Sequence, residues 1–248
     1  MDLFKGLFGF ITGNFNELDK PIFAKPYIDK SYDLLELARR LDQAPEESKP
    51  HFREAMESMA AKIKTHQRIN DLLVNSNMPL LILYDLHIKC DAGEANIDFA
   101  VLTNRFITAI SCPTQEKEFG ASSEQSAYIL TEILSEECLV NKKNLQIVRP
   151  MTISPESPGY LESPESPESS DKGNRTSEDK KKSGSSLFSE TYPKIHRNIF
   201  VKPDDFLAQL KLFFRMDDDF CWLTNHELFT ISDALLEYDK NNGHVSKN

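Results

Sequence analysis

The sequence predicts an α/β (α+β) fold in which a mixed β-sheet, with a hairpin at its centre, is flanked by helices. Before Asn104-Arg105, Ile97, Phe99 and Val101 alternate with Asp98, Ala100 and Leu102, and a second β-rich run follows over 106–112. Apolar residues recur every three or four positions over 52–73, which is typical of a helix. Segments of the two kinds follow one another along the chain, and 40% hydrophobic residues among 248 suffice for a core.

The central hairpin lies within 96–114 and contains β-branched and aromatic residues on both sides of its turn. A two-residue turn at Asn104-Arg105 fixes which residues lie opposite one another, whereas a turn one residue away would shift every pair. The pairs for the two-residue turn are Thr103 with Phe106, Asp98 with Ser111, and Asn96 with Pro113. Asp98 then stands on a mostly apolar strand, where an unpaired charge is costly.

Two helices are predicted before the hairpin. The first begins near Ser31, a good N-cap residue, and ends at Pro45. The second carries one stripe of residues that we expect to pack in the core: Phe52, Met56, Met59, Ile63, His66, Asn70 and Leu73. On this stripe His66 is interpreted as a neutral, hydrogen-bonded core histidine, with a ligand or catalytic role as the alternative.

The remaining elements follow from the same patterns. Strands are predicted at 80–89, 145–148 and 199–201, and helices at 124–138 and from Asp204 or Asp205 onward. Thr224 and Glu227 form a capping box that opens a last helix. The polar, Ser-Pro-rich stretch 154–191 cannot bury a core, so it is interpreted as a disordered insert.

The predicted organisation has five parts. An N-terminal apolar segment and helix occupy 1–44, a core occupies 45–153, and the insert occupies 154–191. The strand and helices at 192–240 complete the core, and 241–248 is a tail. Ser-Pro sites in the insert could be phosphorylated, and a low-complexity spacer is the simpler interpretation.

Charge and cysteine usage limit the functional classes. The chain has 29 Lys plus Arg against 39 Asp plus Glu and a net charge of −10, which argues against a broad phosphate-binding surface but leaves room for a local basic groove. The four cysteines form no C-x-x-C pair, which favours a reduced, cytoplasmic protein. Residues 1–11 have one apolar helical face that either docks on the domain or makes peripheral membrane contact.

Several stretches together resemble one known family. They are Asn-Ser-Asn-Met-Pro-Leu-Leu-Ile-Leu-Tyr-Asp-Leu at 75–86, Ala-Asn-Ile-Asp-Phe-Ala-Val-Leu-Thr at 95–103, Ala-Ile-Ser-Cys-Pro-Thr at 109–114, and the closing pieces 200–212 and 223–236. In this order they resemble the nuclease-related domain (NERD) family, a branch of the PD-(D/E)-x-K nuclease superfamily, over roughly 59–238. The resemblance implies a restriction-endonuclease-like core.

The resemblance also implies a metal-dependent active site. In the family a helix Glu, a strand Asp, and the Glu and Lys of a Glu-x-Lys strand hold a divalent metal and activate water. These positions fall on His66, Asp98, Ser111 and Pro113, so only Asp98 is retained. Asp98 remains a candidate metal ligand, and migrated partners are sought in Glu94, Glu116 and Glu118. Parity along the strand places Cys112 on the opposite face, which argues against a Cys112 nucleophile.

The resulting hypotheses differ in chemistry. The preferred one is a pseudo-nuclease that has lost catalysis and serves as a binding or scaffold module for nucleic acid or a protein partner, with no cofactor. The alternative is a weak nuclease that uses Mg²⁺ or Mn²⁺ with Asp98, His66 and a migrated Glu. A third is a membrane-peripheral protein tethered through residues 1–11, and a fourth makes the Ser-Pro insert the regulated element.

Overall fold

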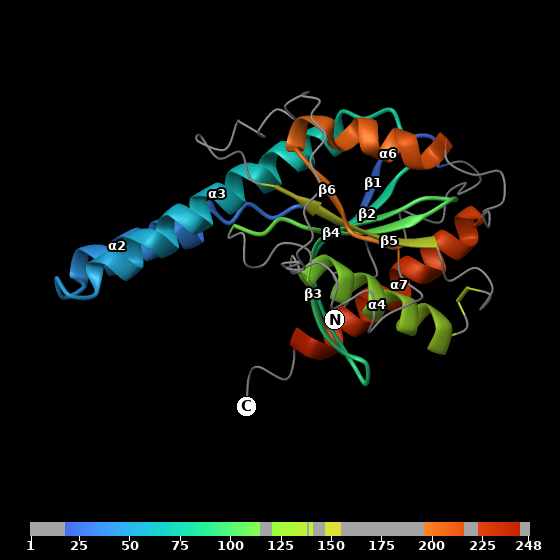
Figure 1. Cartoon of the computed structure of the whole chain (residues 1–248). Helices are drawn as coiled ribbons and strands as arrows, with labels where there is room; N and C mark the ends of the chain where they lie inside the picture. Colours follow the sequence, from blue (N-terminus) through green and yellow to red (C-terminus); the bar gives the residue numbers. More distant parts are fainter. Residues whose placement is uncertain are drawn as a thin grey trace, which may run out of the picture.

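The structure is a computed structural model that describes residues 18–114, 121–137, 139–140, 147–154, 196–215 and 223–243. A six-stranded sheet lies between two helical layers (Figure 1). The strands are β1 (Ile22–Lys25), β2 (Leu81–Cys90), β3 (Gly93–Leu102), β4 (Ile107–Ser111), β5 (Val148–Ile153) and β6 (Ile199–Val201). The helices are α2 (Ser31–Gln43), α3 (Lys49–Val74), α4 (Ala121–Glu136), α6 (Phe206–Arg215) and α7 (Asn225–Gly243), with a 3₁₀ turn, η3 (Pro203–Asp205).

The sheet is mixed, and its strands lie in chain order from β1 to β6. β1 runs parallel to β2, and β4, β5 and β6 run parallel to one another. β2, β3 and β4 form the antiparallel centre. The prediction of an α/β fold with a central hairpin and flanking helices is therefore confirmed.

Each face of the sheet has its own apolar core because the central strands carry apolar side chains in both alternating sets. α4 and α7 cover one face with residues that include Leu130 and Ile231. α3 and α6 cover the other face with residues that include Ile69, Leu73 and Phe206. The sheet is therefore buried on both sides, and polar groups on its central strands need partners within the protein.

The hairpin has the predicted register. The backbone N–H of Thr103 donates to the carbonyl of Phe106 across Asn104-Arg105 at 2.9 Å. Phe99 pairs with Ile110 and Leu102 with Ile107, in the register of the two-residue turn. Continuing this register brings Asp98 opposite Ser111, the last residue of β4.

β2 contains one irregularity that the sequence does not reveal. Asp85 has a φ of 53°, in the left-handed region that residues other than glycine rarely adopt. The β2–β3 pairing passes from Tyr84 and Phe99 to Leu86 and Ile97 without an Asp85 pair. The Asp85 carboxylate lies 2.9 Å from Lys30 Nζ, so an ion pair accompanies the distortion.

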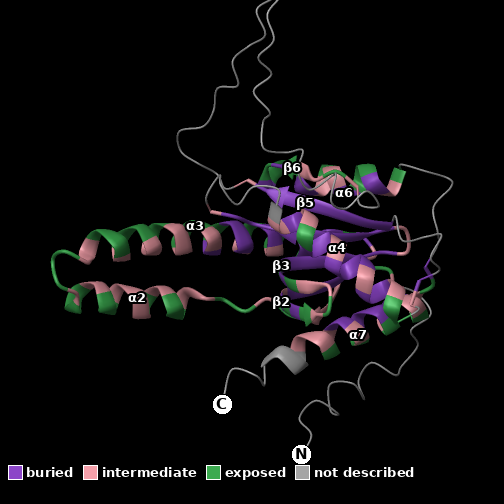
Figure 2. Cartoon of the chain, turned by 60° about the horizontal axis from the view of Figure 1, so that its bottom comes forward, coloured by how far each residue is buried: buried purple, intermediate pink, exposed green. Residues whose placement is uncertain are grey.

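α2 and the first half of α3 form a helical hairpin that projects from the body, here called the arm (residues 31–60; Figures 1 and 2). α2 has no buried residue, and Ile63 is the first buried residue of α3. The predicted core stripe is therefore correct only for its second half. Phe52, Met56 and Met59 are only partly buried, in the part of α3 that belongs to the arm, where α3 packs against α2.

Element boundaries show further differences from the predictions. β1 was not predicted, because it is four residues long and lies between Pro21 and Pro26. β5 begins at Val148, the last residue of the predicted strand, and continues to Ile153. Lys30, rather than Ser31, is the N-cap residue of α2, and the Asp29 carboxylate accepts the Ser31 N–H.

The closing elements match their predictions. β6, α6 and the last helix occupy the expected positions. The Thr224 N–H donates to Glu227 at 2.7 Å, and the Glu227 N–H donates to Thr224 Oγ1 at 3.2 Å, so the capping box is confirmed. The apolar segment 1–11, nearly all of the Ser-Pro insert and the end of the chain lie outside the described residues.

Candidate functional site

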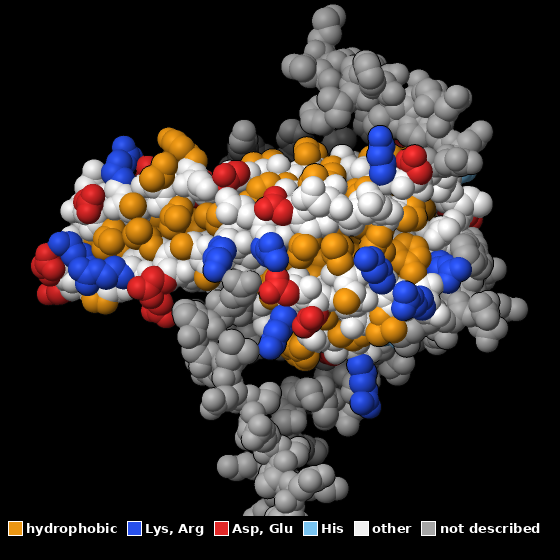
Figure 3. Space-filling model, turned by 90° about the horizontal axis from the view of Figure 1, so that it is seen from above, with side chains coloured by type: hydrophobic (Ala, Val, Ile, Leu, Met, Phe, Trp, Pro, Cys, Tyr) orange, Lys and Arg blue, Asp and Glu red, His pale blue; other side chains and the backbone are white. Residues whose placement is uncertain are grey.

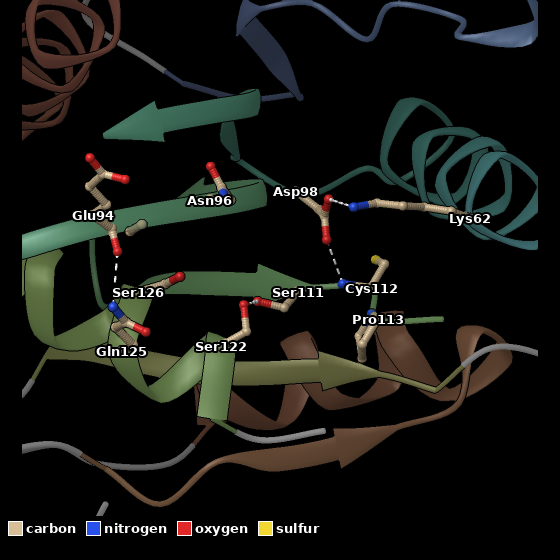
Figure 4. A pocket seen from close by; sticks show the side chains of 11 residues that line it. Lys62, Glu94, Asn96, Asp98, Ser111, Cys112, Pro113, Ser122, Gln125 and Ser126 are labelled. Carbon is tan, nitrogen blue, oxygen red and sulfur yellow. Dashed lines mark hydrogen bonds and ion pairs between the residues drawn. The ribbon is translucent and has the colours of Figure 1, made fainter. Parts of the chain in front are cut away.

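A pocket of about 440 Å³ opens where α3, β3, the end of β4 and the start of α4 meet (Figure 4). Asp98, Ser111 and Pro113, three of the four positions that the resemblance singled out, line this pocket. The other lining residues are Lys62, Glu94, Ala95, Asn96, Cys112, Ser122, Gln125 and Ser126. The pocket thus brings together groups from the hairpin and two helices, and most of its polar lining is uncharged.

Asp98 is the most constrained charge in the pocket. Its Oδ1 lies 2.9 Å from Lys62 Nζ and 3.3 Å from His66 Nε2. Its Oδ2 accepts the backbone N–H of Cys112 at 2.6 Å. Both carboxylate oxygens therefore have partners, which answers the question of how the strand tolerates this charge.

These partners determine the protonation state of Asp98. Burial disfavours the charged carboxylate, but the His66 imidazole, the Lys62 ammonium and the Cys112 amide outweigh it and lower the pKa of Asp98 to about 2. Burial also opposes the charge of Lys62, yet Asp98 raises the pKa of that ammonium. The two groups are consequently an ion pair at neutral pH.

His66 lies between Asp98 and the apolar core of the α3 face. Its Nδ1 is 2.9 Å from the hydroxyl of Tyr84, and its ring makes edge contacts with Tyr84 and Phe99. The side chain is almost completely buried. Nε2 points toward Asp98 but has no hydrogen-bond partner of good geometry. His66 is thus a buried, hydrogen-bonded core histidine, as interpreted from the sequence, and its other edge faces Asp98.

Ser111 and Pro113, on which the resemblance places the Glu and the Lys, carry no charge. Ser111 lies 3.5 Å from the hydroxyl of Ser122, and Pro113 closes the pocket next to it. Glu94 lies at the far end, and its carboxylate pairs with Lys89 on the surface (Figure 4). Glu116 and Glu118 lie outside the described residues. Among the described residues, Asp98 therefore has no acidic neighbour with which to share a metal ion.

Strand parity predicted that Cys112 lies away from the site. The structure instead places Cys112 beside His66 and Asp98. Cys112 continues the alternation of β4 and shares the α3 face with Ile110, whereas the alternation of β3 breaks at Asp98, because Ile97 lies in the core of the α4 face and Phe99 in that of the α3 face. Asp98 therefore turns to the α3 face, where Cys112 lies. The Sγ of Cys112, the His66 ring and the Asp98 carboxylate each offer a ligand atom, and these atoms lie within 4.8 Å of one another. Burial raises the pKa of the Cys112 thiol well above its ordinary value, which disfavours a nucleophilic thiolate.

Lys62 is the site residue that sequence reasoning missed. It lies one helical turn before His66 on α3, so the two side chains emerge on the same side of the helix. Its side chain is 44% exposed and reaches over the rim of the pocket to Asp98. The sequence contained one indication of this arrangement, because Lys62 lies four residues before the buried His66 and therefore on the same side of the helix. Its link to Asp98 is a long-range contact that spacing alone does not show.

Mg²⁺ does not fit this arrangement. That ion prefers oxygen ligands in strict octahedral geometry and is usually held by one or two carboxylates and by substrate phosphates. Here Asp98 is the only carboxylate among the described residues at this end of the pocket, and the Lys62 ammonium already lies on it. The residues present therefore do not reproduce the metal centre that the resemblance implies.

Comparison of the chain with protein-family models, with curated proteins and with solved structures found no match. The functional class therefore has to be argued from the fold and the pocket. None of the helices in the described ranges is both long and apolar enough to cross a membrane.

Proposed function

We propose that this protein is a catalytically silent relative of the NERD nucleases that acts as a protein-binding scaffold. The observation that carries the loss of catalysis is the state of Asp98. Both of its oxygens are engaged by Lys62, His66 and the Cys112 amide. Phosphodiester hydrolysis of the NERD kind needs several acidic ligands around Mg²⁺ or Mn²⁺, and Asp98 has no acidic neighbour among the described residues for that role.

The choice of a protein partner rests on the surface. The net charge of −10 opposes nucleic acid, and Asp98 neutralises the lysine of the pocket. The arm, in contrast, exposes large apolar side chains: Tyr32 is 77% exposed and Leu35 is 67% exposed. Figure 3 shows hydrophobic side chains along the arm, with charged side chains around them.

The arm also specifies the chemistry of its partner. Asp33 and Glu36 lie toward the start of α2, and Arg39 and Arg40, both ion-paired with Glu36, lie toward its end before Asp42. An apolar helix or groove edged by basic and then acidic residues would match both this charge order and the apolar side chains between. The scaffold is therefore expected to bind a protein surface of that kind through α2.

Two measurements test the two halves of this proposal. Incubation of the full chain with single- and double-stranded DNA and with RNA, in Mg²⁺ or Mn²⁺, is expected to give no cleavage above an Asp98→Ala control. Cleavage that disappears with EDTA and with Asp98→Ala would establish the nuclease alternative instead.

The scaffold half is tested by photo-crosslinking in cells. A benzoylphenylalanine placed at position 32 is expected to crosslink one protein, and the additional substitution Leu35→Glu is expected to abolish the product. The same photoreactive group at Lys211, an exposed position on α6, is the matched control. Equal products from both positions, or a crosslink to nucleic acid, would refute a protein-specific arm.

A further inference from the structure

We propose that His66, Asp98 and Cys112 form a binding site for a borderline transition-metal ion such as Zn²⁺ or Co²⁺. The proposal concerns a different chemistry from the scaffold function and does not depend on it. The three ligand atoms, an imidazole nitrogen, a carboxylate oxygen and a thiol sulfur, all lie within 4.8 Å of one another. Nitrogen and sulfur ligands select such ions over Mg²⁺ and Ca²⁺.

The geometry suits a tetrahedral ion. Zn–N and Zn–O distances are about 2.0 to 2.1 Å, so two such ligands on a tetrahedral centre are roughly 3.3 Å apart. Nε2 of His66 and Oδ1 of Asp98 are separated by 3.3 Å. The Cys112 sulfur lies within the same small volume, and a longer Zn–S bond of about 2.3 Å accommodates a slightly wider spacing.

His66 provides the independent indication of a ligand. Its Nε2 is buried and lies 3.3 Å from Oδ1 of Asp98 without a hydrogen bond of good geometry, so this buried nitrogen is not satisfied in the usual way. Its other nitrogen lies 2.9 Å from the Tyr84 hydroxyl. Metal binding uses the tautomer in which Nδ1 carries the proton and donates it to the Tyr84 hydroxyl, which leaves the lone pair of Nε2 for the ion, whereas in the other tautomer Nε2–H faces Asp98. Metal-binding histidines are commonly oriented by such an outer hydrogen bond.

Lys62 occupies the cation position while no metal is bound. Its ammonium lies 2.9 Å from Oδ1, and its half-exposed side chain can withdraw into solvent. An arriving Zn²⁺ would displace this ammonium, and the Cys112 thiol would release one proton to the solvent as the Zn–S bond forms. The ion, the thiolate and the Asp98 carboxylate then sum to zero charge, as the lysine and carboxylate did before.

The pocket gives the ion a route and leaves one coordination position. Asp98 and Cys112 both line the pocket, which is open to solvent, so the ion does not have to cross the core. Three protein ligands leave the fourth position of a tetrahedral ion to a water molecule on the pocket side.

Cobalt titration tests the site directly. The full chain carrying Cys90→Ser, Cys138→Ser and Cys221→Ser retains Cys112 as its single cysteine. Addition of one equivalent of Co²⁺ is expected to produce a thiolate-to-cobalt charge-transfer band in the near ultraviolet, and Zn²⁺ is expected to remove it by displacement. Mg²⁺ in large excess should leave the band unchanged.

Three variants in this background locate the ion. Cys112→Ala should abolish the band, and His66→Gln should weaken cobalt binding by at least tenfold. Lys62→Gln should strengthen cobalt binding by about tenfold, because the competing ammonium is gone. Far-ultraviolet circular dichroism confirms that each variant is folded, and Lys62→Gln gives a gain of binding that misfolding cannot mimic.

An absent band in the single-cysteine chain, or a band that persists after Cys112→Ala, overturns the proposal. Unchanged cobalt affinity in Lys62→Gln overturns the placement of the ion on Asp98. DNA cleavage with Mg²⁺ would refute the scaffold proposal without producing a cobalt band, so failures of the two proposals are distinguishable.

Discussion

The Lys62 ammonium lies 2.9 Å from Oδ1 of Asp98, so α3 supplies the cation that neutralises the buried charge of the central hairpin. The two residues come from different layers of the fold, and their side chains meet at the rim of the pocket (Figure 4). The same ion pair therefore stabilises the folded hairpin and determines the charge of the pocket.

The first prediction concerns removal of the charge. Asp98→Asn keeps the shape of the side chain but loses the charge-assisted contacts with Lys62, His66 and the Cys112 amide. We expect the free energy of unfolding to fall by about 2 to 3 kcal/mol, which corresponds to a pKa lowered by about two units. Urea denaturation in the presence of a chelator measures this loss. A change in the free energy of unfolding below about 0.5 kcal/mol would show that these contacts do not stabilise the fold.

The second prediction concerns pH. The pKa of Asp98 is lower in the folded protein, about 2, than in the unfolded chain, so unfolding binds a proton in this range. The stabilisation is therefore complete above about pH 4 and is lost as the pH falls from about 4 to 2. Thermal melts of the wild type and Asp98→Asn should converge across this interval. If the melting temperatures of the two proteins stay equally far apart down to pH 2, ionisation of Asp98 is not the source of the stabilisation.

The third prediction concerns the left-handed residue of β2. Asp85 has a φ of 53° and an ion pair with Lys30. Asn tolerates this backbone conformation, so Asp85→Asn should cost about 1 kcal/mol through the partly exposed ion pair alone. Asp85→Val should cost roughly 2 to 4 kcal/mol, because a β-branched residue is strained there. Urea midpoints compare the two, and equal losses would mean that the backbone relaxes freely.

The fourth prediction separates the arm from the core. Leu35 on the arm is 67% exposed, whereas Leu73 near the end of α3 is fully buried against the sheet. Leu35→Ala should change the free energy of unfolding of the isolated protein by less than about 0.5 kcal/mol. Leu73→Ala should cost about 2 to 5 kcal/mol. A large loss for Leu35→Ala in dilute solution would place the arm within the cooperative fold.

The features that the sequence predicted well are local. The hairpin register follows from the two residues Asn104 and Arg105, and the capping box follows from Thr224 and Glu227, so a few neighbouring positions define each. The hairpin register correctly placed Ser111 opposite Asp98 in the backbone pairing. The predicted face of Asp98 was wrong, because the alternation of β3 breaks between Ile97 and Phe99, next to the unpaired Asp85 of β2.

The features that the sequence did not predict depend on distant contacts. Lys62 is an ordinary surface lysine by pattern, and only the packing of α3 against the hairpin brings it to Asp98. The arm has the same apolar spacing as the buried half of α3, because a helix facing a single partner helix needs the same periodicity as one facing a sheet. The left-handed Asp85 lies within an apolar run that reads as a regular strand. Binding of a metal ion in the pocket and binding of a protein partner by the arm are both predictions.

α3 is one unbroken helix from Lys49 to Val74, and its parts have different surroundings. At 1.5 Å per residue its 26 residues form a rod about 39 Å long. The outer end belongs to the arm, Lys62 lies near the middle, and the inner end is fixed between the sheet and α6. One secondary-structure element therefore carries the surface of the arm, the cation of the pocket and part of the apolar core, so a substitution that breaks this helix near Lys62 would disturb all three.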